Sequence, residues 1–115
     1  MTRTPEQIFR HHAEALVAGD MDEFMSDYGD DSVLITAGGA VRGNGQIRDA
    51  FSGVLSMLTN PSWDLHTRIF DGDVLFLAWN VTSDTNRMEG VDTFVFSENG
   101  IRAHTVHFVA EPVAS

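Results

Sequence analysis

The sequence contains no cysteine. Thiol nucleophiles, thiolate metal ligands and disulfide bonds are therefore excluded, and the chain is compatible with a reducing compartment. There is also no apolar run of about eighteen residues, and the polar beginning of the chain has no apolar stretch like that of a secretory signal. We therefore predict no membrane segment and a cytoplasmic location.

Basic residues are scarce. The chain has seven Lys and Arg residues and seventeen Asp and Glu residues, which gives a formal net charge of −10 at pH 7. Such a chain repels phosphate backbones and anionic lipids, so we expect neither nucleic acid nor a membrane as a partner. Solubility explains this acidity better than attraction of a cationic substrate. With 115 residues, of which 43% are hydrophobic, the composition predicts a single folded domain over residues 1–115.

The first third of the chain has the spacing of helices. Thr4, Pro5 and Gln7 form a capping-box pattern, which predicts a helix from there to about Ala18, ended by Gly19. One face of this helix is apolar and includes His12. The first helix is therefore expected to pack against the rest of the domain.

Two further helices and a strand follow. Asp20 is expected to cap a second, short helix, which extends through Tyr28 at helical spacing. A β-branched strand at 33–36 precedes a turn at Gly38-Gly39, and Asn44 is expected to cap a third helix over 46–58. These elements complete the helical part of an α+β domain.

The remainder alternates with the period of strands. Turn signals divide it into four strands, at about 62–70, 74–82, 88–96 and 101–109, which predicts an antiparallel meander. Both faces of the strand 74–82 are largely apolar. One face is expected to meet the helices, and a second copy of the chain is expected to cover the other. We therefore predict a homodimer through the sheet.

The histidines are the first candidates for chemistry. His12 lies on the apolar helix face, where it is either a satisfied core residue or part of a pocket wall. Strand alternation places His104 and His107 on opposite faces, so they are not expected to share a metal ion, and no metal site is predicted. His11 and His66 are expected at the surface.

Asp92 is the most unusual carboxylate, because strand alternation places it on the same face as Phe94 and Phe96. Apolar neighbours make such a carboxyl expensive to ionise, so that it could donate a hydrogen bond or shuttle a proton. The alternative is a structural pairing with Arg87 or Arg102 near the strand entrance. The aromatic residues are more often plain core than a binding site, and the other acids are expected in turns and caps.

Several short motifs together resemble the nuclear transport factor 2-like superfamily, in the branch of SnoaL-like polyketide cyclases and ketosteroid isomerases. The stretches that carry the resemblance are 15–22 (ALVAGDMD), 28–33 (YGDDSV), Arg42-Gly43 before Gln46-Ile47, 92–96 (DTFVF) and 99–101 (NGI). The resemblance implies three N-terminal helices packed in the concave face of a strongly curved, mixed and mainly antiparallel sheet. It also implies a cone that is open to a small apolar molecule and is lined by Leu75, Leu77, Trp79, Val81, Asp92, Phe94, His104 and Phe108.

Comparison with ketosteroid isomerases gives a mixed result. Asp92 stands where those enzymes have the Asp of the oxyanion hole, and His12 replaces its tyrosine. Thr36 stands in place of the carboxylate that moves the proton, so the usual isomerisation is not expected. The resemblance instead implies cofactor-free acid–base chemistry, with His12 or His104 as base and Asp92 or Tyr28 as donor. Tyr28, Thr36, Phe51 and Trp63 complete the expected ligand contacts; a non-catalytic binding pocket or a filled interaction domain are the alternatives.

Overall fold

The computed structural model describes residues 3–113, which contain three helices and six strands. In chain order these are α1 (Pro5–Ala18), α2 (Met21–Met25), β1 (Tyr28–Thr36), β2 (Gly39–Arg42), α3 (Asn44–Leu55), β3 (Ser62–Asp71), β4 (Val74–Thr82), β5 (Asn86–Ser97) and β6 (Gly100–Pro112). The predicted α+β class is confirmed. Residues 1–2 and 114–115 of the expected domain lie outside the described range.

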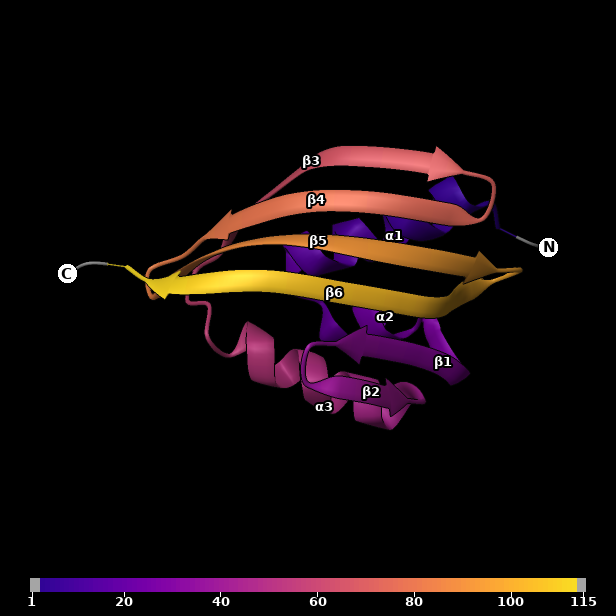
Figure 1. The fold of residues 1–115 in the computed structure, drawn as a ribbon, viewed down its shortest axis with the longest axis horizontal. Helices are drawn as coiled ribbons and strands as arrows, with labels where there is room; N and C mark the ends of the chain where they lie inside the picture. The colour runs from indigo at the N-terminus through magenta and orange to yellow at the C-terminus, as the bar shows by residue number, and fades with distance from the viewer. Residues whose placement is uncertain (1–2, 114–115) are drawn as a thin grey trace.

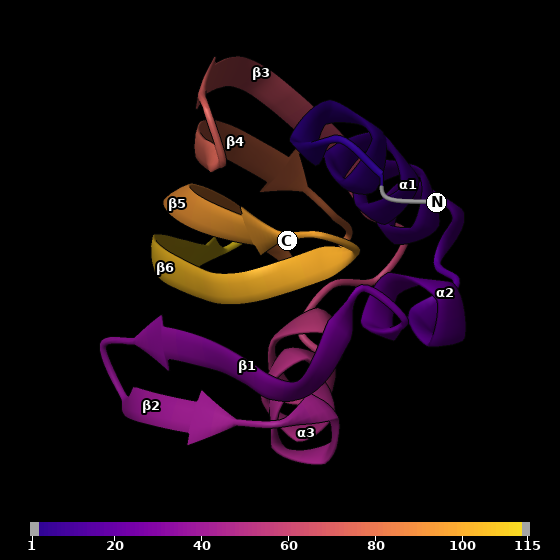
Figure 2. The same cartoon turned by 90° about the vertical axis from the view of Figure 1, so that its right-hand side faces the viewer.

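The six strands form one open sheet in the order β2-β1-β6-β5-β4-β3 (Figure 1). Strands β3 to β6 form the predicted antiparallel meander, whereas β1 pairs with β6 in parallel. The view along the long axis shows all three helices on the same side of the sheet (Figure 2). The sheet therefore has a covered inner face and an open outer face.

Helix α1 begins and ends as its sequence predicts. Thr4 Oγ1 accepts a hydrogen bond from the backbone N–H of Gln7, and the Gln7 side chain accepts one from the backbone N–H of Thr4. Gly19 follows the last turn with φ 72°, a left-handed conformation that few other residues adopt at low cost. The buried face of the helix carries His12 among Ile8, Phe9, Ala13 and Ala15.

Predictions around α2 and α3 were wrong at their boundaries. Helix α2 ends at Met25, and Tyr28 is the first residue of β1, where it pairs with Ile101 of β6. Gly43, and not Asn44, occupies the cap position of α3, which runs over Asn44–Leu55. The Asn44 amide instead donates to the backbone carbonyls of Met25 and Tyr28. These long-range pairings outweigh local helical spacing, and strand β2 had no local signal strong enough to predict it.

Alternation along the strands decides which side chains face the helices. In β4, the predicted inward residues are all buried, namely Leu75, Leu77, Trp79 and Val81. In β6 the prediction fails at one end, because the register with β5 shifts between Val95 and Phe96. This bulge places Ile101 inside, only 1% exposed, although simple alternation puts it outside with Ala103. From His104 onward the predicted faces hold.

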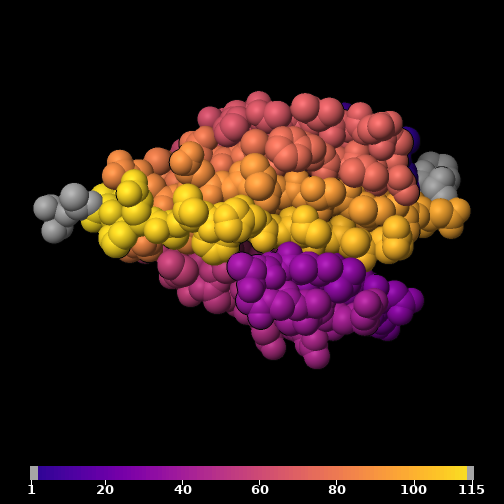
Figure 3. Space-filling view, in the orientation of Figure 1, coloured from indigo at the N-terminus to yellow at the C-terminus, as the bar shows by residue number. Residues whose placement is uncertain are grey.

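The outer face of the sheet carries several large apolar side chains in contact with solvent. They include Ile69 of β3, Phe76 of β4, Val91 of β5 and Val109 of β6. In the space-filling view this face is a continuous surface formed by β3 to β6, with β1, β2 and α3 beside it (Figure 3). In residues 3–113, no helix is long and apolar enough to cross a membrane.

Candidate functional site

A cavity of about 430 Å³ lies between the helices and the inner face of the sheet. This volume is within the range of about 300–1,000 Å³ that is usual for small-molecule sites. Ten of the residues proposed from the sequence line it: His12, Thr36, Phe51, Trp63, Leu77, Trp79, Asp92, Phe94, His104 and Phe108. Leu75 and Val81 are buried in the core outside the cavity wall, and so is Tyr28, which acts through hydrogen bonds described below.

The polar part of the cavity wall centres on Asp92. Its Oδ2 lies 2.8 Å from Nε2 of His104, and its Oδ1 accepts a hydrogen bond of 2.8 Å from the Trp79 indole N–H. Asp92 and His104 are 8% and 2% exposed, so both are largely removed from water. The alternative pairing with Arg87 is not formed, because that guanidinium lies 3.5 Å from Glu111 instead.

The sheet register places these groups together. Phe94 pairs with His104 across β5 and β6, and Leu77 pairs with Asp92 across β4 and β5. The His104 ring stacks on the Phe94 ring, with centroids 3.9 Å apart and an angle of 21° between planes. This stacking fixes the imidazole plane, so that its Nε2 edge is directed at Asp92.

Gly90 makes room for the indole of Trp79. A Cβ atom at this position would lie 2.6 Å from Cε2 of Trp79 and 3.0 Å from the carbonyl oxygen of His107. The first of these distances is shorter than real Cβ contacts and the second is tight, so a side chain at this position would displace the indole that lies across β5 and reaches Asp92.

Behind Asp92 and His104, the polar contacts continue into the core. The Tyr28 hydroxyl lies 2.8 Å from Nδ1 of His104 and 3.3 Å from Nε2 of His12. Nδ1 of His12 lies 3.3 Å from Oδ2 of Asp27. The result is a continuous buried row from Asp92 to Asp27, of which every member is at most 8% exposed.

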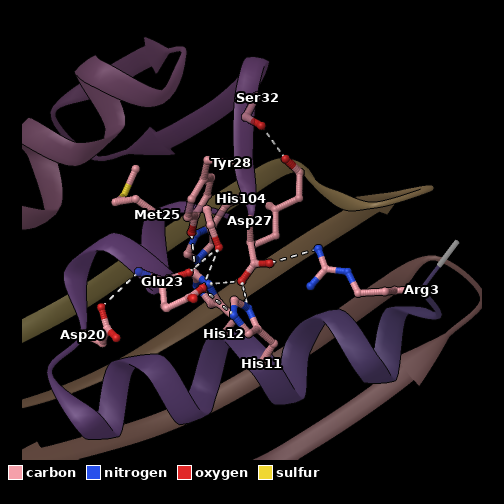
Figure 4. A network of polar contacts seen from close by, with 12 residues as sticks. Arg3, His11, His12, Asp20, Glu23, Met25, Asp27, Tyr28, Ser32 and His104 are labelled. Atoms are coloured by element: carbon pink, nitrogen blue, oxygen red, sulfur yellow. Dashed lines mark hydrogen bonds and ion pairs between the residues drawn. The ribbon is translucent and has the colours of Figure 1, made fainter. Parts of the chain in front are cut away.

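Asp27 forms the far end of this row and the centre of a charged cluster (Figure 4). Its Oδ2 also accepts from Nδ1 of His11 at 2.8 Å, and Arg3 Nη2 lies 3.1 Å from its Oδ1. The contact with Arg3 is an ion pair without hydrogen-bond geometry, because Oδ1 has no hydrogen-bond partner among the described residues. Nε2 of His11 contacts Glu23 at 3.0 Å.

The cluster shifts the pKa values of its members in different directions. Burial by itself raises the pKa of Asp27, but hydrogen bonds from His12 and His11 outweigh it and hold the pKa below its ordinary value. Burial lowers the pKa of His12 and so disfavours its charged form. The hydrogen bond to Asp27 raises the pKa of His11. Burial, followed by the charges of Asp92 and Asp27, raises the pKa of Tyr28 well above its ordinary value.

Sequence reasoning missed Asp27 and the contacts of His11. Asp27 lies between a helix and a strand, where acids are usually turn residues, and nothing local distinguishes it from such a residue. His11 was expected on the surface, and its side chain is partly exposed at 35%, with both ring nitrogens in contact with carboxylates. His66 is exposed, as predicted. Within residues 3–113, no group of three or more His, Asp or Glu side chains is arranged to hold a metal ion.

A smaller cavity of about 210 Å³ adjoins the first. The two share four wall residues, namely Leu16, Phe24, Leu55 and Trp63. Apart from Asp20, the walls of the smaller cavity are apolar or carry only glycine.

Comparison with known proteins agrees with this architecture. A family model described as a SnoaL-like domain matches residues 9–104. No curated protein matches the chain. Among solved structures, a proposed ketosteroid isomerase from Kribbella flavida has a TM-score of 0.77 at 16% identity, with 100% of this chain and 87% of that one covered.

Two other solved structures are similar to the same degree. A proposed SnoaL-like polyketide cyclase from Shewanella putrefaciens has a TM-score of 0.74 at 13% identity, covering 89% of this chain and 77% of that one. An NTF2-like protein of unknown function from Burkholderia xenovorans has a TM-score of 0.76 at 16% identity, covering 96% and 86%. At these sequence identities, the structural similarity is evidence for a shared fold alone.

Proposed function

Because this chain belongs to the SnoaL-like domain family, we propose that its larger cavity binds a small apolar molecule and carries out cofactor-free acid–base chemistry on it. Asp92 is the residue that touches the substrate, and His104 is its partner. The substrate class is a small apolar ketone, lactone or polyketide fragment. The type of substrate is taken from the similar structure described as a proposed polyketide cyclase. The small size and apolar character of the substrate are taken from the volume and lining of the cavity.

The observation that carries the proposal is an acid–base pair in an otherwise apolar cavity. Nε2 of His104 and Oδ2 of Asp92 are 2.8 Å apart, and both residues line the cavity wall. A charge that develops on a substrate in such a site interacts strongly with these groups, because little water screens it.

Spare hydrogen-bonding capacity assigns the roles. Both ring nitrogens of His12 are engaged by Asp27 and Tyr28, and both of His104 are engaged by Tyr28 and Asp92. The carboxyl oxygens of Asp92 each have one protein partner and retain a further lone pair. Asp92 can therefore contact a substrate without breaking an internal hydrogen bond.

The reaction that fits these roles is a proton transfer at carbon. Asp92 as carboxylate takes a proton from a C–H bond beside a carbonyl group, which leaves an enolate, while His104 as imidazolium balances the charge. The enolate carbon then forms a bond to a second carbonyl carbon of the same molecule, or is protonated at another carbon. Asp92 returns its proton to the new alkoxide or to that carbon. The product is an isomer of the substrate, so no cofactor is consumed.

A second candidate is a binding protein that does not convert its ligand. Two of the histidines on the cavity wall, His12 and His104, already have two hydrogen-bond partners each, which is the arrangement expected of a structural polar network. In that case the cavity binds the same class of molecule, and Asp92 only orients it.

The outer sheet face supports a homodimer. Phe76 and Val91 are 42% and 43% exposed at the centre of this face, and Ile69 and Val109 extend it. Several large apolar side chains exposed on one face of a sheet are typical of a surface that a partner covers. We propose that a second copy covers it, through the same face of its own sheet.

The test combines binding and turnover. The protein is incubated with a mixed library of small ketones, lactones and polyketide fragments, and native mass spectrometry identifies retained ligands while chromatography follows conversion. We expect wild type to retain and convert a ligand, Asp92→Asn to retain it and convert it at least about a hundredfold more slowly, and the exposed control Asp64→Asn to behave as wild type. Equal conversion by Asp92→Asn refutes the catalytic role. Retention without conversion by wild type favours the binding protein.

A further inference from the structure

The row of hydrogen bonds from Asp27 to Asp92 has two possible directions, because hydroxyl and imidazole groups can each donate or accept. Its four contacts join Asp27 to His12 at 3.3 Å, His12 to Tyr28 at 3.3 Å, Tyr28 to His104 at 2.8 Å, and His104 to Asp92 at 2.8 Å. Each residue in the row has at most two protons that it can donate. The number of available donors therefore determines the direction of the hydrogen bonds.

Counting begins at Asp27, which as a carboxylate can only accept. His12 must therefore carry its proton on Nδ1. Because His12 is only 3% exposed, its neutral form is favoured. A neutral imidazole has one N–H group, so Nε2 of His12 accepts from the Tyr28 hydroxyl. That hydroxyl has now used its one proton.

The same count continues to the cavity. Because the Tyr28 hydroxyl proton points at His12, its oxygen accepts from His104, which places a proton on Nδ1 of His104. Nε2 of His104 then faces Oδ2 of Asp92 at 2.8 Å. Two lone pairs cannot approach so closely, so one more proton lies between these atoms, on the carboxyl or on the imidazole.

The opposite direction of the hydrogen bonds leaves a different number of protons on the pair of Asp92 and His104. If Tyr28 donated to Nδ1 of His104, the only imidazole proton would be on Nε2 and would point at an ionised Asp92. The pair of Asp92 and His104 would then hold one proton fewer. In that direction a neutral His12 would donate from Nε2 to Tyr28, and its Nδ1 would present a lone pair to the Asp27 carboxylate, which repels it. Only an imidazolium at His12 could donate to both neighbours, and the burial of this ring in the core disfavours the charged form.

We propose that Asp27 is a positioning residue that sets the direction of this row and thereby keeps one additional proton on the pair of Asp92 and His104. It acts across His12 and Tyr28, without a place on the cavity wall. Transfer of that proton to a substrate rests on the function proposed above. The tautomers of His12 and His104 are independent of that function.

Neighbouring charges hold Asp27 in its accepting form. Arg3 lies 3.1 Å from Oδ1 and His11 donates to Oδ2 at 2.8 Å, so two positive or donating groups surround the carboxylate. Glu23 contacts only the far nitrogen of His11. The cluster thus anchors one end of the row, and His11, which is partly exposed, connects it to solvent.

The experiment reads the ring nitrogens directly, in the absence of any substrate. Protein labelled with ¹⁵N-histidine is compared by NMR with Asp27→Leu, which removes the acceptor and keeps the branching of the side chain, and with Tyr28→Phe, which interrupts the row at its centre. Glu23→Gln is the control, because it changes the cluster without touching the row. His66 and His107 serve as exposed internal references in every spectrum.

In wild type and in Glu23→Gln, we expect protonated Nδ1 signals for both His12 and His104. In Asp27→Leu, the proton on His104 moves from Nδ1 to Nε2, so that the Nδ1 shift changes by the full difference between a protonated and an unprotonated nitrogen. Tyr28→Phe gives the same change at His104 while His12 keeps its Nδ1 proton. If Asp27→Leu does not fold, Tyr28→Phe still tests the row.

An unprotonated Nδ1 of His104 in wild type overturns the proposal, and so does an unchanged His104 in either variant of the row. Neither result depends on turnover. Conversely, Asp92→Asn could convert the substrate as fast as wild type while the wild-type spectrum shows the predicted tautomers. That combination would refute the proposed function and leave the role of Asp27 intact.

Discussion

Substituting Gly90 with alanine is expected to destabilise the protein through a single side chain, Trp79. The added Cβ would lie 2.6 Å from Cε2 of Trp79 and 3.0 Å from the carbonyl oxygen of His107. The carbonyl belongs to the β5–β6 ladder and cannot move freely, so the indole must shift. Trp79 is 7% exposed and packs near Trp63 and Phe108, which leaves little room for that shift.

The magnitude follows from two contributions. Overpacking a core costs about 1–3 kcal/mol. Loss of the indole hydrogen bond to Asp92 adds about 1–2 kcal/mol, because the carboxyl stays buried without this donor. We therefore expect Gly90→Ala to lower the free energy of unfolding by roughly 2–5 kcal/mol, which corresponds to a fall in melting temperature on the order of 10–20 °C for a domain of this size.

Urea unfolding, followed by tryptophan fluorescence and circular dichroism, measures the effect. Gly53→Ala is the matched control, because Gly53 lies within α3 with no heavy atom within 4 Å of its built Cβ, so this change should stabilise by about 0.5–1 kcal/mol. In a double-mutant cycle, Trp79→Leu should remove most of the cost of Gly90→Ala. An unfolding free energy of Gly90→Ala within about 0.5 kcal/mol of wild type, or the absence of coupling to Trp79, would refute the reasoning.

Three further predictions concern pH, assembly and helix capping. Because the pKa of His11 is raised in the folded state, its contribution to stability is fully present below pH 6.5 and is lost as the pH rises through the folded pKa. His11→Gln should therefore destabilise more at pH 5.5 than at pH 8.5 in urea titrations, and an equal loss at both would contradict the ion pair with Asp27. Val91→Lys on the outer face should convert a dimer to a monomer in analytical ultracentrifugation, whereas a monomeric wild type would remove the proposed interface. Thr4→Ala should cost about 1 kcal/mol of unfolding free energy by removing the cap that Thr4 and Gln7 share, and no measurable loss would show that the cap is dispensable.

Local chemistry explains why some of the candidate site is visible in the sequence. His12 stands out because it is a titratable residue on an apolar helix face, and Asp92 because it alternates with Phe94 and Phe96 on one strand face. Both observations depend only on near neighbours. Both residues do lie on the wall of the larger cavity, although their chemical roles remain proposals.

The partners of these residues could not be predicted in the same way. Asp27 looks like a turn residue until the parallel pairing of β1 with β6 brings it beneath α1, and Tyr28 looks helical until it pairs with Ile101. Trp79 has an indole N–H that needs an acceptor, but only the register of β4 with β5 places Asp92 within reach. Each of these contacts depends on strand pairings that no local pattern specifies.

The sequence by itself determined the helix cap at Thr4, the four strands of the meander, and the inward faces of most strands, because capping and alternation act between residues that are close along the chain. Tertiary structure alone decided that a cavity remains between helices and sheet, and that Asp27, His12, Tyr28, His104 and Asp92 form one row through the core. A hydrogen bond requires its atoms to approach within about 3 Å, and such a distance between residues far apart along the chain exists only once the register of the sheet and the packing of α1 are set.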